Sequence, residues 1–195
     1  MLVAAGHTDA IDRMGLLFWR DGALAPRGPE KLAEMVRDVT ALGGVFLRNL
    51  FALAAAAALL LMRLRREAAF FVLTVVLGWI VNTGIKHIAA RARPEIVPHL
   101  TEAAGPSFPS GHSFNAAVVY IAMALAFAAL SSRRSVRLTV IGAAVLGSLA
   151  IAWSRVWLGV HWPSDVLAGW FGGAAWAFTA SALLHRPARG HSGAA

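Results

Sequence analysis

Two histidines and an aspartate in the second half of the chain have side chains suited to nucleophilic and acid–base chemistry. His112 ends the tetrapeptide PSGH at 109–112, and His161 precedes Asp165 by four residues. Histidine changes its protonation state near neutral pH, so it can act as a nucleophile or as a general acid and base. A carboxylate that holds one ring nitrogen fixes the tautomer of the imidazole. These three residues are therefore candidates for a catalytic group.

Basic residues and a serine–glycine pair accompany the two histidines along the sequence. Cations and hydrogen-bond donors of this kind hold anionic groups, and the planar fork of arginine suits a phosphate. The candidates for binding an anion are Lys86, Arg93, Ser110, Gly111 and Arg155.

The composition indicates that these polar residues belong to a membrane protein. The chain has 195 residues, of which 58% are hydrophobic and only 14% charged. Soluble domains are closer to half apolar and a quarter charged. The absence of cysteine excludes disulfides, zinc–thiolate sites and cysteine nucleophiles. The formal charge of +8 is typical of the basic loops that orient membrane proteins, so we expect no nucleic-acid partner.

Five apolar runs are long enough to cross about 30 Å of hydrocarbon as helices. They are rich in helix formers and lack the alternating pattern of barrel strands. The sequence therefore predicts an all-α, polytopic membrane helix bundle of about five transmembrane helices. The runs are 42–62, 68–88, 113–130, 138–157 and 165–184.

The two ends of the chain differ from this apolar middle. Residues 1–41 contain no run long enough to span, and we expect one or two amphipathic surface helices there, with a break at 25–29. Residues 42–185 are the predicted transmembrane domain. Residues 186–195 are expected to form a disordered cytoplasmic tail.

The distribution of arginines between the apolar runs predicts the orientation in the membrane. By the positive-inside rule the connections richest in arginine face the cytoplasm. The candidate site residues then all lie near the opposite, outer face, where the rule disfavours bases, so we infer that an anion is bound there. The cytoplasmic arginines are Arg63, Arg65, Arg66, Arg133, Arg134, Arg137, Arg186 and Arg189.

Each candidate also has a purely structural interpretation. Lys86 could extend to the membrane surface from a helix end, Ser110 could cap a helix, and His161 with Asp165 could be a capping pair. The joint occurrence of all these residues in three separate segments favours a functional site over any of these explanations.

Three complete motifs resemble a known family. Residues 86–94 fit K-x6-R-P, residues 109–112 are PSGH, and residues 154–165 fit S-R-x5-H-x3-D. In this combination the chain, over about residues 36–185, is similar to the type 2 phosphatidic acid phosphatase (PAP2) superfamily, in its membrane lipid phosphatase branch.

The resemblance implies a metal-independent lipid phosphatase without a cofactor. His161 would be the nucleophile that forms a phosphohistidine, Asp165 would orient it, and His112 would protonate the leaving oxygen and later activate water. We expect Asp165 to favour positive charge on His161 and the nearby cations to disfavour it on His112. Arg91 is outside the motifs and is expected to be auxiliary or to face lipid headgroups. The residues expected to bind the substrate phosphate are Lys86, Arg93, Ser110, Gly111 and Arg155.

The expected lipid phosphatase activity is compatible with several substrates, and the composition indicates a cellular location. Phosphatidic acid, phosphatidylglycerol phosphate and undecaprenyl pyrophosphate satisfy the motifs equally, and the helices indicate no oligomeric state. Alanine- and arginine-rich usage is typical of a GC-rich bacterium, so we expect the inner (plasma) membrane with the site on the periplasmic or extracellular side. Membrane members of the family commonly have six spans, and the span before residues 1–41 is missing from the predicted five.

Two other functions are compatible with parts of the pattern. His112, His161 and Asp165 could form a metal-dependent hydrolase site, although the surrounding cations would repel a divalent ion. A membrane anion transporter or scaffold would also need cations, but it would not need the His161–Asp165 pair.

Overall fold

The computed structural model describes residues 7–184, and its regular structure there is helical apart from one isolated bridge between Arg20 and Pro26. The all-α prediction is thus confirmed. The helices are α1 (Asp9–Leu17), α2 (Glu30–Leu42), α3 (Val45–Leu61), α4 (Arg65–Ala89), α5 (Gly111–Ala128), α6 (Arg134–Trp157) and α7 (Pro163–Leu184).

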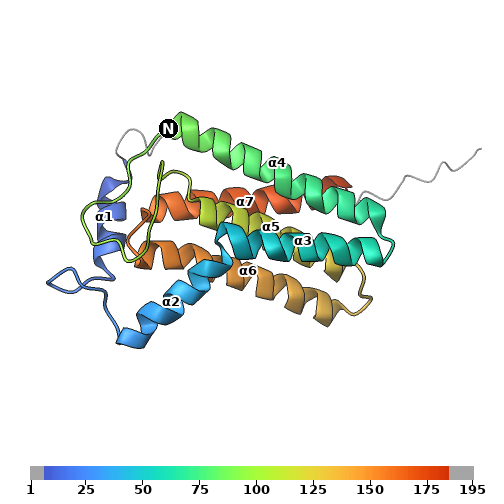
Figure 1. Ribbon diagram of the computed structural model, residues 1–195, viewed down its shortest axis with the longest axis horizontal. Coiled ribbons are helices and arrows are strands. Elements are labelled where there is room, and N and C mark those ends of the chain that lie inside the picture. Colours follow the sequence, from blue (N-terminus) through green and yellow to red (C-terminus); the bar gives the residue numbers. More distant parts are fainter. Residues whose placement is uncertain (1–6, 185–195) are drawn as a thin grey trace, which may run out of the picture.

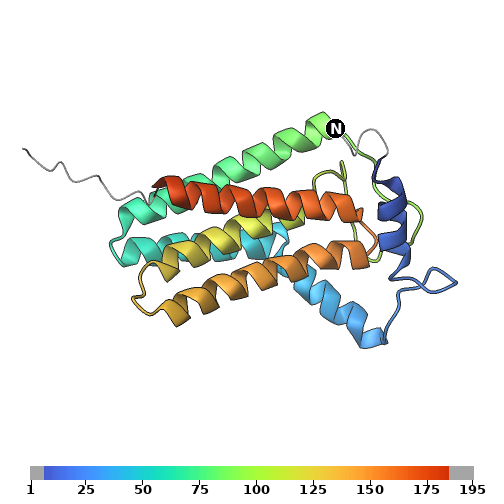
Figure 2. The same ribbon diagram turned by 180° about the vertical axis from the view of Figure 1, so that it is seen from behind.

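Helix α5 is the centre of the bundle, and α3, α4, α6 and α7 pack around it (Figures 1 and 2). The apolar window of α5 is 67% buried, whereas those of α4, α6 and α7 are only 17–28% buried. An apolar surface left exposed on the outer helices is what a lipid environment requires. The chain is therefore an integral membrane protein.

Four helices, α4 to α7, are long and apolar enough to cross a membrane, and a fifth span is formed if α2 and α3 are taken together. These two helices meet at an angle of 47°. The break falls at Gly43 and Gly44, and Gly44 has an extended backbone with ψ of 159°. The run predicted at 42–62 thus corresponds to α3, which is shorter at both ends.

The N-terminal helices cover one end of the bundle. α1 lies across that end, beside the loop of residues 90–110 (Figure 1). Val36 of α2 is buried against Trp157 and Leu158 at the end of α6. The predicted break at 25–29 falls within the connection between α1 and α2. The predicted tail, residues 186–195, lies outside the described residues.

Two glycines bring α7 close to α5. A Cβ atom on Gly173 would lie 2.3 Å from the carbonyl oxygen of Phe114, and one on Gly169 would lie 2.8 Å from that of Ser110. Only a residue without a side chain allows such an approach. The pair therefore fixes the distance between the N-terminal ends of α5 and α7.

Candidate active site

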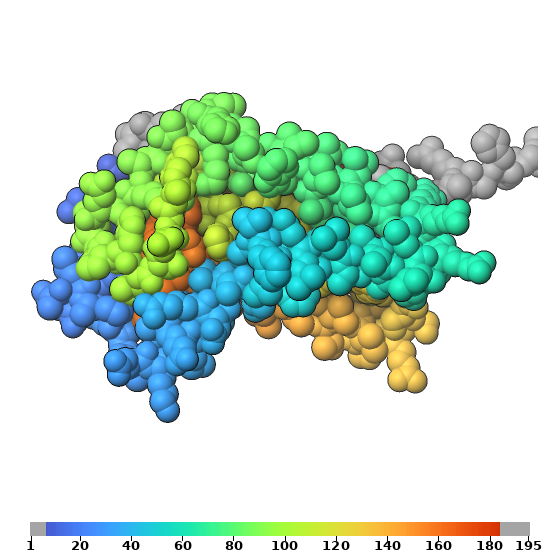
Figure 3. Space-filling model, in the orientation of Figure 1, coloured from blue at the N-terminus to red at the C-terminus, as the bar shows by residue number. Residues whose placement is uncertain are grey.

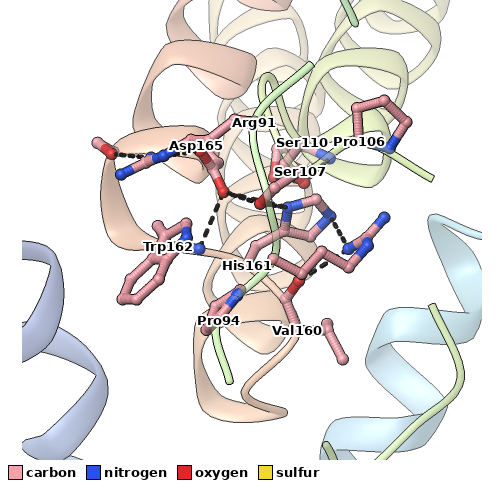
Figure 4. A network of polar contacts seen from close by, with 12 residues as sticks. Arg91, Pro94, Pro106, Ser107, Ser110, Val160, His161, Trp162 and Asp165 are labelled. Carbon is pink, nitrogen blue, oxygen red and sulfur yellow. Dashed lines mark hydrogen bonds and ion pairs between the residues drawn. The ribbon is translucent and has the colours of Figure 1, made fainter. Parts of the chain in front are cut away.

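All of the predicted site residues lie at the end of the bundle that α1 and α2 cover. They come from the C-terminal end of α4 and the loop after it, the start of α5, and the junction of α6 with α7 (Figure 4). The site residues lie at helix ends and in the connections between helices. Their polar side chains therefore come together without interrupting a membrane-spanning segment.

His161 is held from one side by a buried carboxylate and a buried hydroxyl. Its Nδ1 atom lies 3.5 Å from Oδ2 of Asp165 and 3.4 Å from Oγ of Ser107. The Ser107 hydroxyl donates to the same Asp165 oxygen, which also accepts from the backbone N–H of Trp162 at 3.0 Å. Figure 4 shows His161 pointing toward Ser107 and Asp165. The ring orientation is therefore fixed by several contacts at once.

The second ring nitrogen of His161 faces a cation. Its Nε2 atom is 3.1 Å from the NH1 nitrogen of Arg93. A guanidinium only donates hydrogen bonds, so Nε2 must accept and the proton of the neutral ring belongs on Nδ1, next to Asp165. This tautomer leaves the lone pair of Nε2 on the side of the cations.

Burial makes His161 neutral at physiological pH. The side chain is 2% exposed, and its burial, together with the charge of Arg93, lowers the pKa of His161 to about 4. The hydrogen bond to Asp165 offsets only part of the effect. Asp165 favours positive charge on His161, as expected, but desolvation outweighs the carboxylate and the pKa falls overall.

Three cations lie in this part of the site, and none of them forms an ion pair with a described carboxylate. Arg93 contacts Nε2, Arg155 acts electrostatically on the same ring, and Lys86 is close enough to interact with both arginines. Lys86 donates to the carbonyl of Pro106 at 2.7 Å, and Arg93 donates to the carbonyls of Val160, Gly105 and Ala104.

Arg155, which is 3% exposed, donates from NH1 to the Thr40 hydroxyl at 2.8 Å, while its buried Nε has no partner among the described residues. A buried donor without an acceptor is costly, and an anionic ligand would satisfy this one.

The start of α5 contributes the remaining predicted residues. The hydroxyl of Ser110 accepts from the Ser113 hydroxyl at 2.9 Å and caps α5. Ser110 therefore has the structural role of a helix cap, in addition to any role in binding an anion. A Cβ on Gly111 would lie 3.4 Å from Cε of Lys86, which is ordinary contact. His112 follows, and its ring forms no hydrogen bond with any other residue in the described part of the chain, which leaves both nitrogens available.

Arg91 does not face the lipid headgroups. Its NH1 donates to Oδ1 of Asp165 at 2.6 Å and to the Ser164 hydroxyl at 2.8 Å, and its NH2 pairs with Asp12 at 2.8 Å. Asp12 in turn accepts from the backbone N–H and the hydroxyl of Ser164 at 2.8 and 2.7 Å. Helix α1 is thereby connected to the carboxylate that orients His161. The headgroup-facing alternative for Arg91 was therefore wrong, and its role as an auxiliary residue is the one the geometry favours.

Sequence reasoning missed three residues that shape the site: Ser107, Asp12 and Thr40. Ser107 lies inside the polar stretch at 106–114, where its position between two prolines was the only signal. Asp12 and Thr40 lie on short N-terminal helices, far from every motif. Within residues 7–184, no three histidine, aspartate or glutamate side chains are arranged to hold a metal ion.

The sequence and the fold are similar to those of known proteins. Residues 67–189 match the PAP2 superfamily. Phosphatidylglycerophosphatase B of Bacillus subtilis is 33% identical over 177 residues, which cover 87% of this chain and 82% of that protein. Undecaprenyl-diphosphatase of Sulfolobus acidocaldarius is 33% identical over 109 residues, or 53% of this chain and 47% of that protein.

A solved structure has the same arrangement of helices. The crystal structure of a transmembrane PAP2-type phosphatidylglycerolphosphate phosphatase from Bacillus subtilis matches with a TM-score of 0.83 and 27% identity. The match covers 97% of this chain and 94% of that chain. The likeness therefore includes the N-terminal helices as well as the bundle.

Proposed function

The chain belongs to the PAP2 superfamily, and on that premise we propose that it is a membrane phosphatase that hydrolyses a lipid phosphate monoester or pyrophosphate through a phosphohistidine at His161. The observation that carries the proposal is the cluster of Lys86, Arg93 and Arg155. These cations lack carboxylate partners among the described residues, and one of them, Arg93, contacts the unprotonated nitrogen of a fixed histidine. Such a cluster suits a group that is both anionic and electrophilic, which describes a phosphoryl group.

In the first step, Nε2 of His161 attacks phosphorus. The N–P bond forms while the P–O bond to the lipid breaks, and His112 donates a proton to the leaving oxygen. The imidazole becomes positively charged, and Asp165 stabilises that charge through Nδ1. Ser107 and Arg91 keep the carboxylate in place.

In the second step, the phosphohistidine is hydrolysed. His112, now neutral, takes a proton from a water molecule as the water attacks phosphorus. The P–N bond breaks, inorganic phosphate leaves and His161 is regenerated. Lys86, Arg93 and Arg155 stabilise the charge on the phosphoryl oxygens in both steps, together with the backbone N–H of Gly111 and the hydroxyl of Ser110.

We place the enzyme in a bacterial inner membrane with its active site on the periplasmic or extracellular side. The site end of the bundle is opposite the α3–α4 and α5–α6 connections, where Arg63 and Arg133 lie in the turns and Arg65, Arg66 and Arg134 begin the helices that follow. Substrates of the class phosphatidic acid, phosphatidylglycerol phosphate or undecaprenyl pyrophosphate would reach such a site from the bilayer.

Phosphate release by detergent-purified protein from those three lipids tests the proposal. We expect release that is insensitive to EDTA and lowered by His161→Ala by about 1000-fold or more, because the nucleophile is lost. His112→Gln should also lower release, because both steps use this residue, and a phosphoprotein trapped from the wild type should be labile in acid and stable in alkali, as a phosphohistidine is. Release that EDTA abolishes would contradict the metal-independent mechanism, and release by His161→Ala would contradict the nucleophile.

A further inference from the structure

A groove with a volume of about 470 Å³ runs between α3 and α4 on the lipid-facing side of the bundle, with α5 as its floor (Figure 3). α3 and α5 both begin at the active-site end of the bundle, so their first turns are at the same depth. The groove is polar at that end, where Arg48, Asn49 and Asn115 line it. Deeper in the membrane its walls are apolar, with Leu53 and Phe71 among them. This gradient matches a lipid whose headgroup faces outward and whose chain points inward.

The polar end of the groove adjoins the phosphate site. Asn115 donates from Nδ2 to the carbonyl of Gly111 at 3.0 Å. On the other side, a Cβ on Gly43 would lie 3.2 Å from Cδ2 of His112. The NH1 nitrogen of Arg48 is 3.5 Å from the carbonyl oxygen of that same Gly43. Gly43 thus lies between Arg48 and His112, the proposed general acid.

Arg48 has no charged partner among residues 7–184. Its side chain is 7% exposed, and its only hydrogen bonds within those residues are to the Asn49 amide oxygen, at 3.2 and 3.3 Å, and to Gly43. None of the ion pairs among the described residues includes it. A buried guanidinium within a membrane-spanning segment is costly and marks a functional position. None of the three sequence motifs accounts for this cation.

We propose that Arg48 binds a second anionic group of the substrate, located between the phosphate that is removed and the hydrocarbon chain. The inference rests on the proposed function and narrows its substrate class. Phosphatidylglycerol phosphate has a phosphodiester in that position, and a polyprenyl pyrophosphate has its chain-linked phosphate there. Phosphatidic acid has no second anionic group. The enzyme is therefore specific for lipids that carry two phosphates.

Steady-state hydrolysis of the three lipids in mixed micelles tests this assignment. The wild type should prefer phosphatidylglycerol phosphate or undecaprenyl pyrophosphate to phosphatidic acid, and which of the two it prefers identifies the source of the second anion. Arg48→Gln should lower kcat/KM for the preferred lipid by about tenfold or more, mainly through KM, since a hydrogen bond to a charged group is lost. Its kcat/KM for phosphatidic acid should stay within about threefold.

Arg48→Lys keeps the charge and should retain part of the preference. Arg137→Gln removes an equal charge from an exposed position on α6 and should change no rate. A wild type that prefers phosphatidic acid, or an Arg48→Gln variant that loses all three activities equally, would overturn the inference. If Arg48→Gln does not fold, the wild-type preference and Arg48→Lys decide the question. Absence of hydrolysis of any lipid would instead defeat the proposed function itself.

Discussion

Desolvation sets the protonation state of His161, the proposed nucleophile. A nucleophile with a pKa of about 4 has its lone pair available throughout the neutral range. The carboxylate of Asp165 then acts after the attack, when the ring becomes positively charged and needs a counter-charge. The buried pair of His161 and Asp165 is thus compatible with a neutral imidazole before the attack and with a positively charged one after it.

The lowered pKa of His161 predicts a pH-dependent stability. Between the unfolded value near 6.5 and the folded value of about 4, the unfolded chain binds a proton at this residue that the folded protein does not bind. Stability is therefore lost as the pH falls through that window, and the loss reaches about 2 kcal/mol by pH 5. Thermal unfolding of the wild type in detergent at pH 7 and at pH 5 measures it.

A His161→Gln variant is the control for this prediction because it removes the titrating group from both states. The difference in stability between pH 7 and pH 5 should be smaller in the variant by about 2 kcal/mol. Equal pH dependence in the two proteins would show that His161 is already protonated in the folded protein at pH 5.

Residue types and spacing predicted the charged members of the site, but not the residues that hold them. Lys86, Arg93 and His161 stood out because cations and histidines are unexpected at the outer ends of apolar runs. Thr40, which orients Arg155, is an ordinary polar residue of an amphipathic helix and gave no signal. Hydrogen bonds between distant segments depend on the tertiary path of the chain, which no local pattern encodes.

At the scale of elements, α1 is connected to catalysis through one ion-pair chain. Asp12 is fully buried and joins Arg91 to the start of α7, and Arg91 holds Asp165. Removing one partner of a buried pair leaves the other charge uncompensated. We therefore expect α1 to influence the rate of the reaction without touching the substrate.

Asp12→Asn and Arg91→Gln should each lower kcat by between about 10- and 100-fold, since a small displacement of a catalytic group has an effect of this size. KM should change little. The double variant should be no slower than Arg91→Gln, because both changes act through Asp165. Asp9→Asn, on the exposed face of the same helix, is the matched control. Additive losses, or a rise in KM alone, would contradict this coupling.

The contact between α5 and α7 sets the geometry of the site in a similar way. Gly173→Ala would place a methyl group 2.3 Å from the carbonyl oxygen of Phe114, so the two helices must separate. The hydrogen bond from the N–H of Ser110 to the carbonyl of Asp165, 3.0 Å long, joins the same two helices. We expect a loss of about 1–3 kcal/mol in thermal stability and a lower kcat.

Gly142→Ala is the comparison for that variant, since nothing lies within 4 Å of the added methyl group on α6. Its stability and kcat should match the wild type. A Gly173→Ala protein as stable and as active as Gly142→Ala would show that the close approach of α5 and α7 is not required.

Hydropathy predicted which segments become helices, but it did not predict how the N-terminal ones join. The runs at 68–88 and 138–157 differ from α4 and α6 by only a few residues at each end. The 47° break between α2 and α3 falls at Gly43 and Gly44. Hydropathy averaged over a window of residues does not detect such a break. The loop of residues 90–110 folds by side-chain contacts to distant segments, among them that of Arg93 with Val160.

The two ends of the bundle differ in composition. One end contains the candidate site, the N-terminal helices and the long loop, and the other contains the short turns at 62–64 and 129–133, with arginines in them and in the first helical turn after each. From the positive-inside rule we predict that the turns face the cytoplasm and that the candidate site faces outward. Lipid phosphates would in that case be hydrolysed on the outer leaflet.

The lack of cysteine in the chain makes this orientation directly testable with single-cysteine variants. Glu102→Cys places a thiol in the exposed loop at the site end, and Ser132→Cys places one in the exposed turn between α5 and α6. A membrane-impermeant maleimide added to spheroplasts should label Glu102→Cys, and it should label Ser132→Cys only after lysis. The reverse pattern would place the active site in the cytoplasm, and the arginines at the other end would then contradict the rule from which the orientation was inferred.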